Sequence, residues 1–404
     1  MNNIKNISLF TTATILSMSL LTVMAGAAVA PALGAVKEHF SHADPLLVQL
    51  IVSMPALFII LTNMCFPALC RHFGTKTLAV AGLTLYVLTG CGVFFLDNIA
   101  AILVLRALLG ISVGIIMPLS TGLLAFYFPP EKIAGLMGLS AAMNQLGGVI
   151  ATLLAGMLCV IDWNYAFLVY ALGLIALIMV LVWLPQDSFS PKKNDVEEDA
   201  QPSGFFPLLR KFHPSVTGML LLMIIFFIYP THFAITGRAM SLSQETITWL
   251  MVGMDAVAFI AGLLFGNLMK RFPRSMKYWA PLLFIAGMWV LAAAFDINGL
   301  IIGCLFIGMA TGVGVPYLLT IASIKGGKQA STTVMPLLSA ALYLGQFISP
   351  ILLAPFMSLL GADDSQNAYK IGAVIAFIFL TQTHLTRKFQ SLPPRSDADT
   401  LRRV

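Results

Sequence analysis

Twelve long apolar runs occupy most of this chain of 404 residues. They lie near residues 8–35, 45–70, 77–96, 99–128, 133–160, 164–185, 214–237, 246–269, 278–295, 299–324, 331–360 and 369–386. A helix needs about 20 predominantly apolar residues to cross a bilayer. Hydrophobic residues make up 59% of the chain and charged residues 10%, a composition that excludes a soluble globular protein. The sequence therefore predicts an all-α membrane protein with twelve transmembrane helices.

The first apolar run follows Lys5 and ends in A-G-A-A-V-A, as a secretory signal peptide does. Its apolar part is about twice as long as that of a signal peptide, and eleven further runs follow it. We therefore expect it to be retained as the first transmembrane helix.

The lysines and arginines are distributed unevenly between the two sides that these helices define. If the N-terminus is cytoplasmic, only Lys37, Arg238 and Lys370 face the opposite side, and Arg106 lies within a span. All other Lys and Arg residues then lie on the cytoplasmic side, as the positive-inside rule requires. We expect both termini to be cytoplasmic and the membrane to be the bacterial inner (plasma) membrane. This asymmetry accounts for the net charge of +6, so no nucleic-acid partner is implied.

The cysteines lack the spacing of a metal or redox site. They are scattered through the apolar runs, as Cys65, Cys70, Cys91, Cys159 and Cys304. We interpret them as small core residues and expect neither a metal nor another cofactor.

One polar stretch, with K-K-N-D-V-E-E-D at its centre, separates the first six apolar runs from the last six. Such a run cannot bury apolar surface. The predicted domains are a six-helix bundle at 1–186, a cytoplasmic linker at 187–213, a second six-helix bundle at 214–388 and a cytoplasmic tail at 389–404. Within the linker, F-F-P-L-L-R-K-F-H from Phe205 fits either a segment at the membrane interface or the start of the seventh helix.

The two halves repeat each other at a nearly constant offset. Gly110, Gly114 and Pro118 recur 198 residues later as Gly308, Gly312 and Pro316. Residues 146–156 correspond to 344–354 at the same offset, and residues 67–76 correspond to 266–275 at an offset of 199. This agreement predicts two homologous bundles related by a pseudo-twofold axis along the membrane normal.

Three motifs in these segments resemble those of the major facilitator superfamily, in its twelve-span proton-coupled efflux branch, which contains drug/proton antiporters. Gly74 and Lys76 fit G-x-x-x-D-R-x-G-R-R between spans two and three, although Arg71 replaces its Asp. Arg106 and Gly110 fit R-x-x-Q-G in span four. Residues from Gly147 resemble the antiporter motif G-x-x-x-G-P-x-x-G-G, with Thr152 in place of its proline.

The resemblance implies a secondary active transporter that exports a small organic compound in exchange for protons by alternating access. The sequence contains no G-x-x-x-x-G-K-[ST], so an ion gradient has to supply the energy. A proton-coupled importer or a facilitator of the same fold remains an alternative. A membrane-embedded enzyme or a scaffold is a distant one, and we expect no enzymatic activity. The expected partners are the substrate, protons and membrane lipid, and the expected state is a monomer.

Two ionisable residues lie deep in predicted spans. Arg106 is about 10 Å along its helix from the periplasmic side, where a charge costs about 3 kcal/mol. It either acts on a proton site or an anionic substrate group, or is a structural arginine that helix carbonyls satisfy. Asp255, the only carboxylate this deep, is a plausible proton carrier, or else an acid hydrogen-bonded between helices. In the family fold, spans five and eight meet between the halves, so the two residues could face one cavity.

Other polar side chains in the spans are weaker candidates for the cavity, because amides and hydroxyls often simply join neighbouring helices. They are Asn63, Asn144, Gln145, His232, Tyr343 and Gln346. A further set is predicted to serve conformational change, since small residues allow close helix packing and prolines allow bends. These are Gly74, Lys76, Gly110, Gly114, Pro118, Gly147, Gly308, Gly312, Pro316, Gly345 and Pro350.

Overall fold

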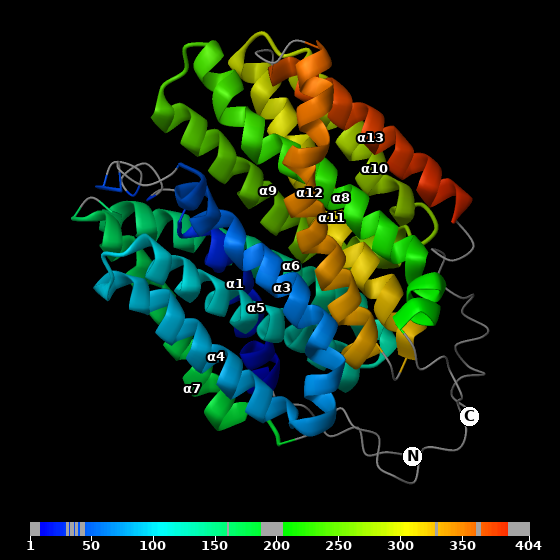
Figure 1. The fold of residues 1–404 in the computed structure, drawn as a ribbon. Helices are drawn as coiled ribbons and strands as arrows, with labels where there is room; N and C mark the ends of the chain where they lie inside the picture. Colours follow the sequence, from blue (N-terminus) through cyan, green and yellow to red (C-terminus); the bar gives the residue numbers. More distant parts are fainter. Residues whose placement is uncertain are drawn as a thin grey trace.

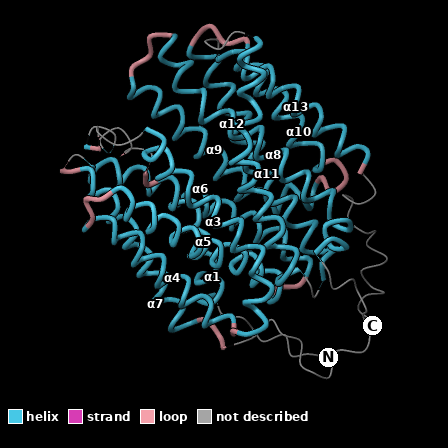
Figure 2. Tube along the Cα trace, viewed as in Figure 1, coloured by secondary structure: helices cyan, strands magenta, loops and turns pink. Residues whose placement is uncertain are grey.

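A computed structural model describes residues 9–29, 32, 36, 39–40, 45–159, 161–186, 205–327, 330–360 and 365–386. These residues form helices, turns and short connections, and the described part of the chain contains no strand (Figure 2). The predicted tail at 389–404 and residues 187–204 of the predicted linker lie outside the described residues. The predicted all-α class is confirmed.

The first half of the chain forms six helical spans. They are α1 (Leu9–Ala27), α3 (Pro45–His72), α4 (Thr75–Gly92), α5 (Ile99–Tyr127), α6 (Pro130–Cys159) and the 3-10 helix η2 (Trp163–Leu172), which continues as α7 (Gly173–Trp183).

The second half repeats this series and lies beside the first half (Figure 1). Its helices are α8 (Phe205–Ala239), α9 (Gln244–Arg271), α10 (Met276–Ala292), α11 (Ile297–Gly326), α12 (Met335–Leu360), preceded by the π-helical turn η4 (Ala330–Val334), and α13 (Ser365–Leu385). Within the described residues, eleven spans are long and apolar enough to cross a membrane, and α10, with 17 residues, is shorter. Because α8 already begins at Phe205, the segment after the linker forms the first turns of this helix.

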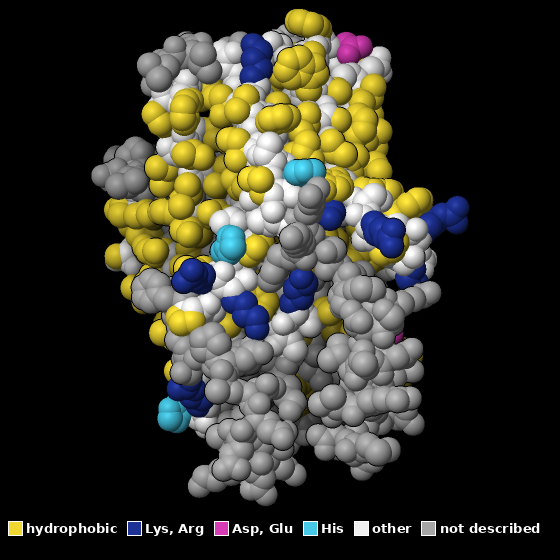
Figure 3. Space-filling model, turned by 90° about the vertical axis from the view of Figure 1, so that its right-hand side faces the viewer, with side chains coloured by type: hydrophobic (Ala, Val, Ile, Leu, Met, Phe, Trp, Pro, Cys, Tyr) yellow, Lys and Arg dark blue, Asp and Glu magenta, His cyan; other side chains and the backbone are white. Residues whose placement is uncertain are grey.

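Basic side chains gather at one end of the molecule, where α3, α5, α7, α9, α11 and α13 end. We call this the basic end; Figure 3 shows Lys, Arg and His side chains below a band of hydrophobic surface. Arg71, Lys132 and Lys270 lie here and are exposed. Along the band, large apolar side chains such as Leu88 and Trp289 are 66% and 65% exposed. Such a surface fits lipid, because hydrocarbon contacts apolar side chains without cost.

The two halves pack their own helices through the same pairs of positions. A Cβ at Gly110 would lie 2.5 Å from the Pro55 carbonyl oxygen of α3, and one at Gly308 would lie 2.5 Å from the Met254 carbonyl oxygen of α9. The glycines are 198 residues apart and their contacts 199 apart. The repeat in the sequence is thus a repeat in helix packing, and the predicted pair of pseudo-symmetric six-helix bundles is confirmed.

The helix starts repeat as well. Asn98 caps α5 by accepting a hydrogen bond from the Ala100 backbone N–H at 2.9 Å, and Asp296 caps α11 through the Gly299 N–H at 2.9 Å. A side-chain oxygen at this position satisfies a backbone donor that the first helical turn leaves free. Both α5 and α11 then run through an internal proline, at Pro118 and Pro316.

Candidate functional site

Arg106 lies inside the first half and is fully buried. Its Nη1 donates a hydrogen bond to Tyr170 Oη at 2.8 Å, and Tyr170 in turn donates to the Ala25 carbonyl oxygen at 2.8 Å. The guanidinium carbon stacks over the Phe167 ring at 4.8 Å from its centroid. Tyr86 packs edge-on against Tyr170 and donates to the Leu21 carbonyl oxygen. α1, α4, α5 and η2 thus surround the cation, and tyrosines beside it are held by carbonyl oxygens of α1.

The surroundings of Arg106 stabilise its positive charge only in part. The carboxyl-terminal end of a helix carries a partial negative charge, which favours a cation near the end of α1. However, Arg106 Nε and Nη2 are buried and have no hydrogen-bond partner among the described residues. Buried donors normally have partners, because an unsatisfied one costs its full desolvation energy. A purely structural role for Arg106 therefore explains the hydrogen bond of one of its nitrogens, but it does not explain why the other two are buried without a partner.

The second half contains a matching polar cluster. Cys304, which occupies the position of Arg106 in the repeat, lies 3.2 Å from Tyr229 Oη. Tyr369, which corresponds to Tyr170, hydrogen-bonds Thr236 Oγ1 at 3.0 Å. Asp255 of α9 is close enough to Tyr229 and Cys304 to interact with them electrostatically. The repeat thus places one polar cluster in each half, a cation in the first and a carboxylate in the second.

Asp255 is half-buried and has no hydrogen bond or ion pair within the described part of the chain. Arg106 contacts η2 and α1, whereas Asp255 lies beside α8 and α11. The structure therefore places the two ionisable residues in separate clusters of the two halves.

The two halves meet through polar and glycine contacts nearer the basic end. On one side, Asn63 Nδ2 of α3 donates to Ser339 Oγ of α12 at 2.8 Å, and this hydroxyl donates to Met117 Sδ of α5 at 3.2 Å. Asn63 and Ser339 are buried. We call this pair the Asn63–Ser339 contact.

On the other side, glycines bring α6 and α9 together. A Cβ at Gly138 would lie 2.5 Å from the Gly262 carbonyl oxygen, and one at Gly266 would lie 2.7 Å from Gly135 Cα. Gly262 corresponds to Asn63 in the repeat, so equivalent pairs of helices are joined by a hydrogen bond on one side and by a backbone contact on the other. We call this packing of α6 on α9 the glycine contact. Both contacts close the molecule at its basic end.

Replacing Asn63 with Ala should weaken the closure at the basic end. A buried hydrogen bond contributes about 1 kcal/mol, so we expect the open form to gain about fivefold in population relative to the closed form. The measure is the alkylation rate of a cysteine introduced at Ala142, which packs against Gly262 in the glycine contact. Asn267→Ala, at an exposed position of α9, is the control. An alkylation rate in Asn63→Ala equal to that of the control would contradict the assigned role.

A chain of hydroxyls joins α1, α5 and α6 inside the first half. Ser19 Oγ lies 2.8 Å from Ser140 Oγ and donates to Ser120 Oγ at 3.3 Å. One turn further, Thr22 donates to Asn144 Oδ1 at 2.9 Å. Asn144 is thus a helix-joining residue here, while its neighbour Gln145 is half-buried with a buried Nε2 that has no partner within the described residues.

Among the described residues, the remaining predicted polar side chains form no hydrogen bond with one another. Tyr343 is buried and Gln346 half-buried on α12, and His232 on α8 hydrogen-bonds the Ile228 carbonyl oxygen through Nδ1 at 3.1 Å. Gly74 is the N-cap residue of α4, and the Lys76 ammonium donates to the Leu181 carbonyl oxygen of α7 at 2.8 Å.

Apart from Gly74, the predicted conformational glycines lie at close contacts between helices of one half. Gly114 packs on Thr62, Gly312 on Ala258, Gly147 on Leu20 and Gly345 on Leu220. Pro350 lies inside α12 and is exposed.

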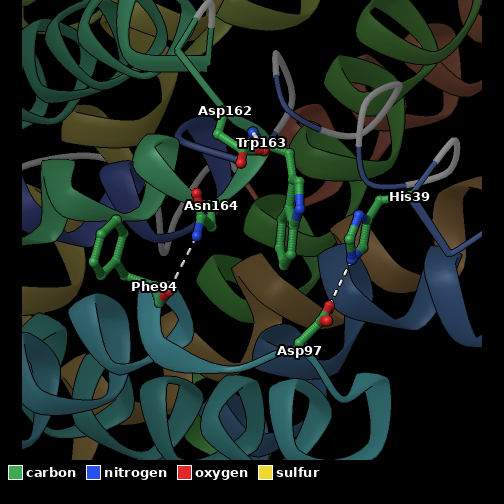
Figure 4. A network of polar contacts seen from close by, with 6 residues as sticks. All are labelled: His39, Phe94, Asp97, Asp162, Trp163 and Asn164. Carbon is green, nitrogen blue, oxygen red and sulfur yellow. Dashed lines mark hydrogen bonds and ion pairs between the residues drawn. The ribbon is translucent and has the colours of Figure 1, made fainter.

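Sequence reasoning missed a polar and aromatic network at the end opposite the basic end (Figure 4). His39 Nε2 pairs with Asp97 at 2.5 Å and its ring lies against that of Trp163. Asn164 donates to the Phe94 carbonyl oxygen at 3.2 Å. Trp163 also packs on Phe167, so this network reaches down to the ring that covers Arg106. No spacing in the sequence marks these residues, because they come from three separate connections.

Within the described residues, no group of three or more His, Cys, Asp or Glu side chains is arranged to hold a metal ion. The site consists instead of two isolated, oppositely charged residues and a set of amides and hydroxyls between twelve helices. This arrangement of repeated bundles around sparse polar groups defines a membrane transport protein.

Comparison with known proteins gives the family. Residues 15–350 match the family model described as Major Facilitator Superfamily, so the chain belongs to this superfamily and is a secondary transporter. Its fold is that of the human organic anion transporter MFSD10 (TM-score 0.76, 16% identity, 92% of this chain and 98% of that chain). The proton:xylose symporter XylE is similar (TM-score 0.75, 13% identity, 93% and 94%), as is FucP in the outward conformation (TM-score 0.73, 16% identity, 95% and 99%).

Curated relatives are more similar in sequence than these structures, but some match over only a small part of their length. Human sialin is 33% identical over 98 residues, which is 24% of this chain but only 19% of sialin. The quinolone resistance protein NorA of Staphylococcus aureus is 27% identical over 327 residues, 72% of this chain and 80% of NorA.

Proposed function

We propose that this protein exports a small organic compound across the bacterial inner membrane in exchange for protons. The basic end faces the cytoplasm, and the two bundles, residues 1–186 and 214–388, rock against each other around the two polar clusters. The protein acts as a monomer and belongs to the proton-coupled efflux branch of its superfamily.

Asp255 is the observation that carries the proposal. It is the only acidic residue deep within the described spans, it is half-buried, and neither a hydrogen bond nor an ion pair holds it within the described residues. A carboxyl in such a position can take up a proton and release it as its exposure changes. One proton that enters through about 150 mV supplies about 3.5 kcal/mol, enough for a substrate gradient of a few hundred-fold.

The contacts between the halves support alternating access. The Asn63–Ser339 contact and the glycine contact both lie nearer the basic end and close it, so the alternate state has to break one hydrogen bond and separate two glycine faces. Neither change breaks an ion pair, so the free-energy barrier between the two states stays low. The similarity to a structure described as outward, that of FucP, agrees with closure on the cytoplasmic side.

The relatives support export and import unequally. NorA, which matches over most of both chains, is named for drug resistance, as an exporter would be. XylE and FucP are described as proton symporters, which keeps a proton-coupled importer as the second candidate.

Transport into inverted membrane vesicles tests the function. With the interior made acidic, a panel of labelled organic compounds is screened for accumulation that depends on the protein. Export by proton antiport predicts accumulation that stops when a protonophore collapses the gradient. Depletion from the same vesicles would favour the importer, and accumulation unaffected by the protonophore would reject proton coupling.

A further inference from the structure

The glycine contact fixes how α6 and α9 lie beside each other. A Cβ at Gly138 would meet the Gly262 carbonyl oxygen, and, one turn nearer the basic end, a Cβ at Gly266 would meet Gly135 Cα. The step from the first meeting point to the second goes backward along α6 and forward along α9, so the two helices are antiparallel. Positions after Gly138 on α6 therefore lie beside positions before Gly262 on α9.

Two polar residues occupy matching positions beyond this contact. Gln145 lies seven residues after Gly138, and Asp255 lies seven residues before Gly262. Seven residues are close to two helical turns, so each residue lies on the same face of its helix as the glycine and about 10 Å further from the basic end. The antiparallel register thus brings Gln145 and Asp255 to the same level of the interface between the two halves.

Neither side chain has a hydrogen-bond partner among the described residues. Gln145 is half-buried with a buried Nε2, and a buried donor without a partner costs its desolvation energy. Asp255 is half-buried and makes no hydrogen bond or ion pair there either. The helices of the two halves diverge from the basic end toward the opposite end (Figure 1), which keeps the two groups beyond hydrogen-bonding distance in this structure.

A primary amide and a protonated carboxyl are chemically complementary. The acid O–H donates to the amide oxygen while the amide N–H donates to the acid carbonyl oxygen, which gives two hydrogen bonds. An ionised carboxylate only accepts, so it leaves the amide oxygen facing a negative charge, and burying that charge is itself costly. Closing α6 on α9 around these two side chains is therefore more favourable when the acid is protonated.

The other groups near Asp255 leave this pairing open. Among the described residues, Tyr229 from α8 and Cys304 from α11 are the titratable side chains that interact with Asp255 electrostatically. A phenol and a thiol are ordinarily uncharged near neutral pH. The titratable residues of α6 lie only in its first and last turns, so Gln145 is the polar group that α6 presents at this level.

We propose that Gln145 is the positioning partner of Asp255, and that its amide pairs with the protonated carboxyl when the end opposite the basic end closes. This inference rests on the proposed proton antiport and adds a residue to it. The pair joins the two halves in the state that carries the proton inward, and it separates again when the carboxyl has lost its proton. Gln145 acts through Asp255 and does not itself carry the proton.

Spin labels at the end opposite the basic end measure this closure. Ile161, after α6, and Phe295, before α11, are exposed and belong to different halves. Double electron–electron resonance on the purified full-length protein gives the ratio of closed to open populations from the short and long distances. We expect this ratio to rise as the pH falls, because a state that binds the proton more tightly is favoured by protonation.

Substitutions of the two residues, alone and together, test whether they interact. Gln145→Leu should lower the closed-to-open ratio at low pH about fivefold, as expected for the loss of a buried hydrogen bond. In Asp255→Ala, where the partner is absent, the same substitution should change the ratio less than about twofold. Gln145→Asn, whose amide is one methylene shorter, should behave as Gln145→Leu does. Asn144→Leu removes an amide that bonds Thr22 within the first half and should leave the ratio unchanged. An equal fall with and without the Asp255 carboxyl, or no fall in either Gln145 variant, would overturn the proposal.

The infrared spectrum reports the hydrogen bond itself. The carbonyl stretch of the protonated Asp255 carboxyl is the band that Asp255→Ala removes from the spectrum at low pH. This band should move to higher frequency in Gln145→Leu, because a carbonyl group that loses a hydrogen bond is stiffer. A band at the same frequency in both proteins would contradict the pairing.

The outcome is separable from that of the transport experiment. A fall in the ratio that depends on Asp255, found together with transport that ignores the proton gradient, would reject proton antiport and keep the pair. Proton-driven accumulation of substrate, found together with an unchanged ratio in Gln145→Leu, would reject the pair and keep the proposed function.

Discussion

Asp255→Asn should reduce the accumulation of substrate in inverted vesicles from a few hundred-fold to about onefold. Asparagine has nearly the shape of aspartate but cannot carry a proton. Proton entry, which supplies about 3.5 kcal/mol per proton, can then no longer drive the transport of substrate. Exchange of labelled for unlabelled substrate should continue, because the two halves still move. The measurement is the ratio of internal to external substrate at steady state under an imposed pH gradient.

Asp296→Asn is the matched control for this prediction. Asp296 is exposed at the start of α11, where its oxygen caps the helix, and asparagine caps helices equally well. This variant should accumulate substrate as the wild type does. Gradient-driven accumulation by Asp255→Asn would remove Asp255 from the coupling mechanism and leave the proposal without its main observation.

Gly147→Val should prevent the protein from accumulating in the membrane in folded form. A Cβ at Gly147 would overlap the Leu20 carbonyl oxygen of α1, and backbone cannot yield as a flexible side chain does. Forcing extra atoms into a packed interface costs about 1–3 kcal/mol even where side chains can adjust, and here helices α1 and α6 would have to separate. The amount of monodisperse protein after detergent extraction is expected to fall at least tenfold.

Gly135→Ala provides the comparison on the same helix. Its added Cβ would have no heavy atom within 4 Å, so expression should match that of the wild type. Gly345→Val, at the equivalent position of the second half, should fail as Gly147→Val does, because Gly345 meets the Leu220 carbonyl oxygen of α8. Normal yields of both valine variants would contradict the packing described for the two halves.

The sequence was sufficient to predict what depends on local pattern and on repetition. Apolar run length located the spans, and the offset between Gly110 and Gly308 predicted two matching bundles. The structure added that the contacts of these glycines, Pro55 and Met254, follow the same offset. Helices of one half therefore pack as their copies do, which is why pattern alone was informative.

Side-chain direction could not be predicted in the same way. Arg106 was predicted to lie deep in a span, but a helical position alone does not say that its side chain meets Tyr170 and Phe167 of η2 rather than the second half. The Asn63–Ser339 contact joins residues 276 apart in the chain, and nothing local in either segment indicates the other. Such contacts depend on how the two bundles dock, which is a property of the whole fold.

Distances between spin labels test most directly whether the two halves move as rigid bodies around the polar clusters. Labels on Lys132 of α6 and Arg274 beyond α9, both exposed at the basic end, span the two halves, and labels on Lys132 and His72 lie within the first. Double electron–electron resonance should give two populations for the first pair, whose ratio changes with pH and substrate, and one unchanged population for the second. A single fixed distance for the first pair under all conditions would contradict alternating access in this protein.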